Sequence, residues 1–258
     1  MLPRLFGITL YRPTLLVAIL AGLALHAFLL RRERLPVMRV FLFVMALLPC
    51  ALIGAKLYSM LMIGRVQPLR VELLGGLRYP GALLGLLLGA VALRRLLPTG
   101  LSVARWGDLF TPAFALEIAI GRLACVFTGC CFGSVSSLPW AMQFSKPSLA
   151  WYLHMDGRLI PPDALVSLPV HPLPVYFMLI ELALVAFTLW FLRRKSYDGQ
   201  VVLIFLAVHG LIKFPLEYLR YPYEWLHQPV PLVLGLAASA VLVAQWLRRR
   251  GSNAYAHA

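Results

Sequence analysis

The chain has 258 residues, of which 61% are hydrophobic and only 13% charged, and its mean hydropathy is +0.82. This composition excludes an ordinary soluble domain and predicts a polytopic membrane protein. The net charge of +14 would suit nucleic acid, but the basic residues gather at the ends of apolar runs, so we expect no nucleic-acid partner.

Apolar runs of about 20 residues are long enough to cross a bilayer, and the sequence offers seven. They cover residues 13–30, 40–63, 79–97, 108–128, 172–192, 200–219 and 230–247. The first is not expected to be a cleaved signal peptide, because Arg31, Arg32 and Arg34 form a stop-transfer flank directly behind it. The sequence therefore predicts an all-α polytopic membrane protein with seven transmembrane helices in a single membrane domain, residues 1–258.

Basic clusters set the predicted orientation. They follow every odd-numbered run, at residues 31–39, 94–105, 193–195 and 248–250. The positive-inside rule then places the N-terminus outside and the C-terminus in the cytoplasm. The longest stretch between runs, about 134–170, is rich in Pro and Ser and carries Trp140 and Trp151, which predicts a small extracytoplasmic cap. A short strand is expected within it, over residues 138–144.

The third run has glycine at every fourth position, at Gly81, Gly85 and Gly89. Such a stripe allows another helix to pack closely. The preceding residues 67–80 include Gly75 and Gly76 and predict a looped or re-entrant entry, which is tolerated where it lines a cavity or is buried in protein. Cys50, within an apolar run, is expected to serve packing.

The segment 121–133, GRLACVFTGCCFG, is the strongest functional candidate. An arginine at membrane depth costs about 2.5–3.5 kcal/mol, so Arg122 is expected to face a cavity, a partner or a substrate unless it reaches the interface. The C-x4-C-C spacing of Cys125, Cys130 and Cys131 is not a standard zinc pattern, even with His154 or His171 as a further ligand. We therefore expect no metal. Redox pairing, a thiolate activated by the arginine and plain buried thiols stay open.

Further charged residues lie inside the runs. His209, Lys213 and Glu217 follow an i, i+4, i+8 pattern and share a helix face, with Arg220 just beyond. This face is either a structural ion pair or a phosphate-binding surface. Three carboxylates lie in the fourth and fifth runs: Asp108, expected to cap a helix or complement its dipole; Glu117, expected to pair with Arg122 or Lys56 or be protonated; and Glu181.

The order of these motifs resembles the bacterial prolipoprotein diacylglyceryl transferase family over about 170 residues. The similarity rests on Gly54–Tyr58, Gly75–Gly85, the 14-residue spacing of Asp108 and Arg122, Gly121–Arg122–Leu123 with Gly129 and Gly133, Leu138–Ala141, His171–Pro172 with Tyr176, and Glu217 with Arg220. Members transfer a diacylglyceryl group from phosphatidylglycerol to the cysteine of a lipoprotein precursor and release glycerol phosphate. They are multi-pass proteins of the bacterial inner membrane.

The resemblance implies that Arg122 binds the lipid phosphate, with Glu217 and Arg220 shaping the same cavity. The further roles combine the resemblance with the chemistry of the residues themselves. Catalytic roles fall on Arg122, Cys130, Cys131 and Tyr79. Phospholipid binding falls on Arg122, Gly133, Lys213, Glu217, Arg220 and Cys125, and structural polar roles fall on Asp108, His171 and Tyr176. No cofactor is implied. The partners are phosphatidylglycerol or another anionic phospholipid, the membrane and a lipoprotein precursor.

The chain departs from the family pattern at five positions. Pro80 replaces the family's histidine, Cys125 its asparagine and Cys130 its glutamate, Lys213 its sixth-helix arginine, and Phe177 a glutamate. Tyr79, His26 or a cysteine thiolate could act as base instead. The alternatives are a thiol-redox membrane protein using Cys130 and Cys131, a transporter, or a non-catalytic lipid-binding paralogue.

Overall fold

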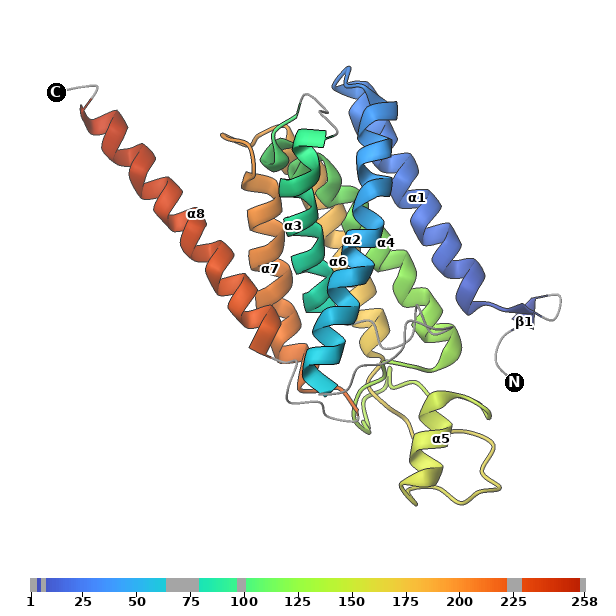
Figure 1. Ribbon diagram of the computed structural model, residues 1–258. Coiled ribbons are helices and arrows are strands. Elements are labelled where there is room, and N and C mark those ends of the chain that lie inside the picture. Colours follow the sequence, from blue (N-terminus) through green and yellow to red (C-terminus); the bar gives the residue numbers. More distant parts are fainter. Residues whose placement is uncertain (1–3, 6–7, 64–78, 97–100, 222–228, 256–258) are drawn as a thin grey trace. The chain divides into compact units, whose positions relative to one another are not determined.

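The computed structural model describes residues 4–5, 8–63, 79–96, 101–221 and 229–255 (Figure 1). A two-residue antiparallel pair, β1 (Arg4–Leu5) and β2 (Ile8–Thr9), precedes the helices. The helices are α1 (Tyr11–Arg32), α2 (Val37–Ile63), α3 (Tyr79–Leu96), α4 (Val103–Thr128), α5 (Leu149–Asp156), α6 (Leu173–Leu192), α7 (Gln200–Glu217) and α8 (Pro229–Tyr255). The fold is therefore helical, as predicted.

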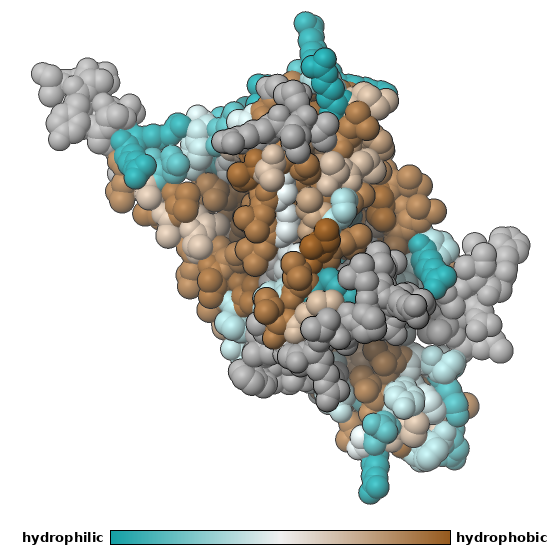
Figure 2. Space-filling model, viewed as in Figure 1, coloured by the Kyte–Doolittle hydropathy of each residue, from teal (hydrophilic) through white to brown (hydrophobic). Residues whose placement is uncertain are grey.

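Six of the described helices are long and apolar enough to cross a membrane: α1, α2, α4, α6, α7 and α8. Each coincides with one of the predicted runs. The remaining run forms α3, whose apolar part covers only Leu84–Leu93, because Arg94 and Arg95 follow directly. Large apolar side chains on the helices are exposed, among them Leu61 (77%) and Leu88 (72%). Brown side chains of this kind cover much of the visible helical surface (Figure 2), as expected of surfaces in contact with lipid.

The chain forms two compact units, one of residues 1–26 with 108–258 and the other of residues 27–107. In the second unit α2 packs on α3 through the glycine stripe. A Cβ atom added at Gly85 would lie 2.1 Å from the Cys50 carbonyl oxygen, and one at Gly89 would lie 2.7 Å from the Cys50 Cβ. The predicted packing roles of the stripe and of Cys50 are thus confirmed.

The first unit contains α4, α6, α7 and α8. A buried cluster of Ala115, Leu184 and Phe205 joins α4, α6 and α7. On α7, a Cβ atom added at Gly210 would lie 2.3 Å from the Pro231 carbonyl oxygen of α8, so these two helices also cross at very short range. The functional side chains described below all belong to this unit.

The segment 134–170, called the cap below, folds around α5. Its core consists of Phe132, Phe144, Ala150 and Val170. Isolated bridges join Met142 to Val170 and Ser145 to Val166; the continuous strand expected over 138–144 does not form, because a turn occupies residues 138–140. The Ala150 amide donates to the Gly129 carbonyl oxygen at 3.0 Å, which ties the cap to the end of α4.

Candidate functional site

The C-terminus of α4 brings two of the cysteines together. Gly129 has a φ of +62°, its amide donates to the Val126 carbonyl oxygen at 3.4 Å, and the Cys130 amide donates to the Cys125 carbonyl oxygen at 3.1 Å. This pair of bonds defines a Schellman motif, in which the residue after the glycine folds back over the last turn. The motif therefore places Cys130 beside Cys125.

The third cysteine, Cys131, has an unusual backbone conformation that brings its thiol to the other two. Cys131 has a φ of +57°, which costs a residue with a side chain about 1–2 kcal/mol. As a result the sulfur atoms of Cys125, Cys130 and Cys131 all lie within 4.8 Å of one another. Hydrogen bonds from the Cys125 and Cys130 thiols lower the pKa of the Cys131 thiol, burial opposes this, and the charges of Arg220 and Arg122 lower it further.

The chain after α7 is bound to the chain after α4, which places Arg220 at this thiol cluster. The Ser134 amide donates to the Leu219 carbonyl oxygen at 2.6 Å, and the Tyr221 amide donates to the Phe132 carbonyl oxygen at 3.2 Å. Gly133 permits the crossing, because a Cβ atom there would lie 2.8 Å from the Leu219 carbonyl oxygen. Arg220 can then reach the Cys131 thiol with a side-chain hydrogen bond.

Three cations and one carboxylate gather at this end of the helices. Arg220 binds Glu217 through two nitrogens, with Nη2 to Oε1 at 3.1 Å. Lys213 Nζ lies 3.9 Å from the same carboxylate. The predicted shared face of α7 thus carries an ion-pair network, and with Arg122 the group holds more positive than negative charge.

Among the residues that the structure describes, Arg122 lies against an aromatic ring and forms no ion pair with an acid. Its guanidinium carbon lies 4.8 Å from the centroid of the Phe177 ring, which is buried; Lys213 Nζ lies 6.0 Å from the same centroid. An aromatic face stabilises a cation without neutralising its charge. Phe177, read from the sequence as a lost glutamate, therefore holds two cations while leaving their charge available to an anion.

Two of the other predicted polar residues, His171 and Tyr176, lie close together. His171 Nδ1 lies 3.4 Å from the Tyr176 hydroxyl, which accepts a hydrogen bond from Trp140 Nε1 at 2.7 Å. Gly133 packs against His171, whose carbonyl oxygen accepts from the Gly133 amide at 2.9 Å. His171 and Tyr176 thus lie where the cap meets the start of α6.

Two carboxylates inside the helices, those of Glu181 and Glu117, have different surroundings. Glu181 Oε1 lies 2.6 Å from His209 Nδ1, a pair between α6 and α7 that sequence reasoning missed. The only available signal was that His209 precedes Lys213 by one helical turn. Glu117 fills the space over Gly22 of α1. Among the described residues it forms no ion pair with Arg122, which was one of the three settings expected for it.

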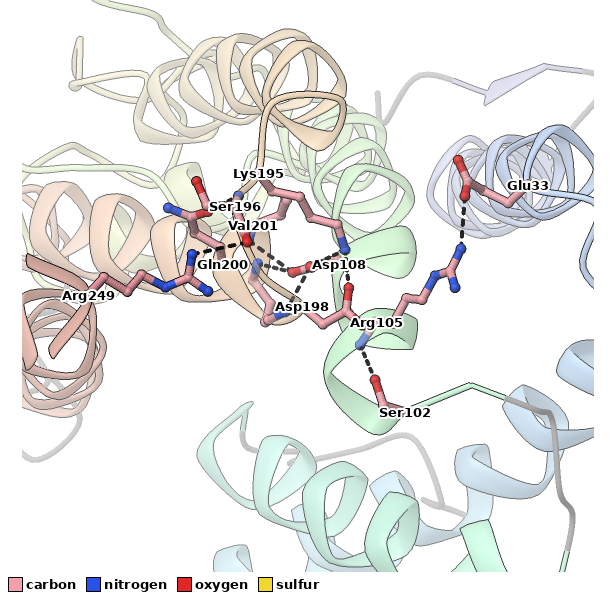
Figure 3. A network of polar contacts seen from close by, with 12 residues as sticks. Glu33, Ser102, Arg105, Asp108, Lys195, Ser196, Asp198, Gln200, Val201 and Arg249 are labelled. Atoms are coloured by element: carbon pink, nitrogen blue, oxygen red, sulfur yellow. Dashed lines mark hydrogen bonds and ion pairs between the residues drawn. The ribbon is translucent and has the colours of Figure 1, made fainter. Parts of the chain in front are cut away.

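Asp108 lies far from this group, about 21 Å from Arg122 along the axis of α4. It does not cap its own helix, which begins five residues earlier at Val103. Its buried carboxylate instead accepts hydrogen bonds at the N-terminus of α7, from the amides of Gly199, Val201 and Val202, and pairs with Lys195 Nζ at 2.8 Å (Figure 3). The expected capping therefore serves another helix.

Two expectations lie outside the described part of the chain. The loop before α3 includes Gly75 and Gly76 at positions that the structure does not describe, and for Tyr79 and Pro80 only their place at the start of α3 is described. A hollow of about 430 Å³ lies elsewhere, between α7 and α8, lined by Tyr197, Trp246 and Arg249 among others. It contains none of the predicted site residues.

Comparison with known proteins bears on this arrangement. The family model for prolipoprotein diacylglyceryl transferase matches residues 2–248. The chain belongs to the prolipoprotein diacylglyceryl transferase family. It is 31% identical over 184 residues to the phosphatidylglycerol–prolipoprotein diacylglyceryl transferase of Bordetella avium, covering 70% of this chain and 60% of the relative.

Other relatives of the same name agree. The Methylibium petroleiphilum protein is 32% identical over 179 residues, covering 67% of this chain and 56% of the relative. The Clostridium tetani protein is 27% identical over 113 residues, 44% of this chain and 40% of the relative. The matched part of the chain thus spans at most about 60% of these relatives' length. Membership of a transferase family and a membrane setting are established by these matches and by the apolar helices.

Proposed function

We propose that this protein transfers a diacylglyceryl group from phosphatidylglycerol to the cysteine thiol of a lipoprotein precursor or a related acceptor. The names of its relatives supply the donor and the acceptor. The proposal includes seven transmembrane helices, an extracytoplasmic cap at residues 134–170 and a location in the bacterial inner membrane. The orientation follows from the basic clusters.

One observation carries the proposal: Lys213 and Arg220 contact the same carboxylate, Glu217, and Arg122 lies with Lys213 against the Phe177 ring beside them. The surplus positive charge suits the phosphate of an anionic phospholipid. Because lipid and protein exclude water there, each cation acts more strongly than it would in solution.

In the reaction, the acceptor sulfur forms a bond to the terminal glyceryl carbon as the bond from that carbon to the phosphate oxygen breaks. The oxygen keeps the electron pair and leaves as part of glycerol phosphate, and the proton of the acceptor thiol passes to water. Arg122, Lys213 and Arg220 bind the phosphate oxygens, where negative charge grows as the bond breaks. Glu217 orients Arg220 and Lys213 for this task, since its carboxylate contacts both.

The test is transfer of a labelled diacylglyceryl group from phosphatidylglycerol to a lipoprotein signal peptide by the purified protein. We expect Arg122→Ala to lower the rate about 100- to 1,000-fold, the size typical of losing one preorganised charge. Arg158→Ala, at an exposed position of the cap, is the matched control and should leave the rate unchanged. An Arg122→Ala variant with wild-type activity on phosphatidylglycerol would refute the assignment.

A second candidate function is thiol redox chemistry, favoured by the three sulfurs within 4.8 Å. Intact mass with and without reductant distinguishes it from the first. Loss of two hydrogens from the protein purified without reductant, and their return on reduction, would support a disulfide at Cys130. Cysteines that stay reduced and unreactive would exclude it.

A further inference from the structure

The thiol cluster has the dimensions of a metal site. Three thiolates, each about 2.3 Å from a tetrahedral zinc ion, stand about 3.8 Å apart. The sulfurs of Cys125, Cys130 and Cys131 already lie within 4.8 Å of one another, and no other such group of three possible ligands occurs in the part of the chain that the structure describes. Side-chain rotations that move each sulfur by less than about 1 Å would close the gap.

The backbone holds these thiols in place before any ligand arrives. The Schellman bonds fix Cys130 over Cys125, and the positive φ of Cys131 turns its side chain toward the other two. The carbonyl oxygens on either side of the cysteine pair, those of Gly129 and Phe132, accept amides of the cap and of the chain after α7. Strained backbone of this kind persists where the surrounding structure enforces it and is concentrated at functional sites.

The surroundings also suit a site with net negative charge. Three thiolates and one divalent cation carry a net charge of −1, and the positive charges of Arg220 and Arg122 act on Cys131. The Thr128 hydroxyl lies 3.2 Å from the Cys130 sulfur. Hydrogen bonds of this kind to ligand atoms orient them and adjust metal affinity. Soft thiolate ligands select zinc or copper(I) over harder cations.

We propose that Cys125, Cys130 and Cys131 bind one Zn²⁺ ion through three thiolates, with the fourth coordination position taken by a thiol. The C-x4-C-C spacing does not predict this site, because two of its ligands are brought together by a helix cap and not by a standard zinc-binding motif. The identity of this thiol rests on the proposed function: it is the thiol of the acceptor cysteine. A thiol that binds zinc loses its proton, here to water, and remains a nucleophilic thiolate.

Zinc would therefore activate the acceptor without a side-chain base. The zinc-bound sulfur forms its bond to the glyceryl carbon while the carbon–oxygen bond to the phosphate breaks, and the resulting thioether is a weaker zinc ligand that can leave. The cations Arg122 and Arg220 contribute twice, by balancing the charge of the thiolates and by binding phosphate. Nucleophile and leaving group would then be positioned within one cluster of side chains.

The first experiment is titration of the full-length, reduced and metal-stripped protein in detergent with Co²⁺, whose charge-transfer absorption reports thiolate ligands. We expect one Co²⁺ per chain, displaced by Zn²⁺, in both the wild type and the Cys50→Ser control. Cys125→Ser, Cys130→Ser and Cys131→Ser should each weaken binding roughly tenfold or more. Wild-type protein without this absorption, or cluster variants that bind as tightly as Cys50→Ser, would overturn the site.

A second experiment tests the fourth position. A lipoprotein signal peptide should change the Co²⁺ absorption, whereas the same peptide with its cysteine replaced by serine should not. No change with the cysteine peptide would overturn the role of zinc in binding the acceptor. Arg122→Ala separates this inference from the proposed function: intact Co²⁺ binding with undiminished transfer would count against the proposed phosphate site alone.

Discussion

At the scale of single residues, the site depends on residues whose conformation or burial is energetically unfavourable in itself. Arg122 lies against an aromatic ring, Cys131 takes a positive φ, and Glu181 is buried beside His209. The positive φ of Cys131 and the burial of Glu181 each cost free energy that helix packing must offset. These residues gather near one end of α4, α6 and α7, which is what a functional site requires and a purely structural core does not.

The strained backbone of Cys131 leads to the first prediction. Glycine adopts positive φ without steric cost, whereas alanine does not. We expect the Cys131→Gly variant to be more stable than Cys131→Ala by about 1 kcal/mol, measured by denaturation in detergent micelles. Both variants lack the thiol, so the difference isolates the backbone. An alanine variant as stable as the glycine variant would show that this conformation is not strained.

His154 leads to a prediction on pH. Burial lowers the pKa of its side chain, whose Nδ1 accepts the Leu168 amide at 3.2 Å. Since the folded pKa lies below the unfolded value of about 6.5, the stability that the neutral ring gives is complete above that value and is lost as pH falls through the folded pKa.

We therefore expect the cap amides, including that of Leu168, to be less protected from hydrogen exchange at pH 5 than above about pH 6.5, after correction for the intrinsic pH dependence of amide exchange. The His154→Gln variant keeps an acceptor but does not titrate, so its cap should show no such extra pH dependence. An identical pH dependence in both proteins would exclude His154 as its source.

At the scale of elements, the helices were predictable and their mutual contacts were not. An apolar run of about 20 residues in lipid can satisfy its backbone only as a helix, and the run predicted at 40–63 forms Val37–Ile63. Contacts between distant residues leave little trace in sequence. Asp108 caps a helix that begins 92 residues later, and Phe177 meets Arg122 from another helix.

The capping of α7 gives an element-scale prediction. Asp108 has no exposed surface, and its loss would leave the amides of α7 without their acceptor and the Lys195 ammonium with Asp198 as its remaining partner. We expect Asp108→Ala to lower stability by about 3 kcal/mol, measured as a lower thermal midpoint in detergent. Asp198→Ala removes the exposed partner of the same lysine and should cost well under 1 kcal/mol. Equal effects of the two variants would contradict the capping role.

At the scale of the whole molecule, the basic clusters predict orientation. Together with the seven crossings proposed above, they predict an N-terminus outside the cytoplasm and a cap on the same side. Alkaline phosphatase fused within residues 158–163 of the cap should be active, and the same reporter after residue 195 should be inactive. Active reporters at both positions would contradict the predicted topology, and with it the access of a secreted acceptor to the thiol cluster.

The family could be predicted from the order of motifs, but the chemistry of the site could not. Helical periodicity identified Glu217 and Arg220 as candidates, and the cost of an arginine at membrane depth identified Arg122. It did not reveal that the three sulfurs converge, since their meeting depends on a helix cap and on the positive φ of Cys131. The replacement of polar side chains by cysteine thus looked like a loss, whereas the geometry indicates a different way to activate a thiol.

The most direct test of the whole account is lipoprotein maturation in a bacterial strain depleted of its own prolipoprotein diacylglyceryl transferase. The strain would express this protein, and the mass of a reporter lipoprotein would be measured. We predict that the wild-type chain adds one diacylglyceryl group to the reporter cysteine and that Arg122→Ala, expressed at the same level, does not. A reporter that remains unmodified in the presence of well-expressed, correctly folded wild-type protein would contradict the proposed transfer.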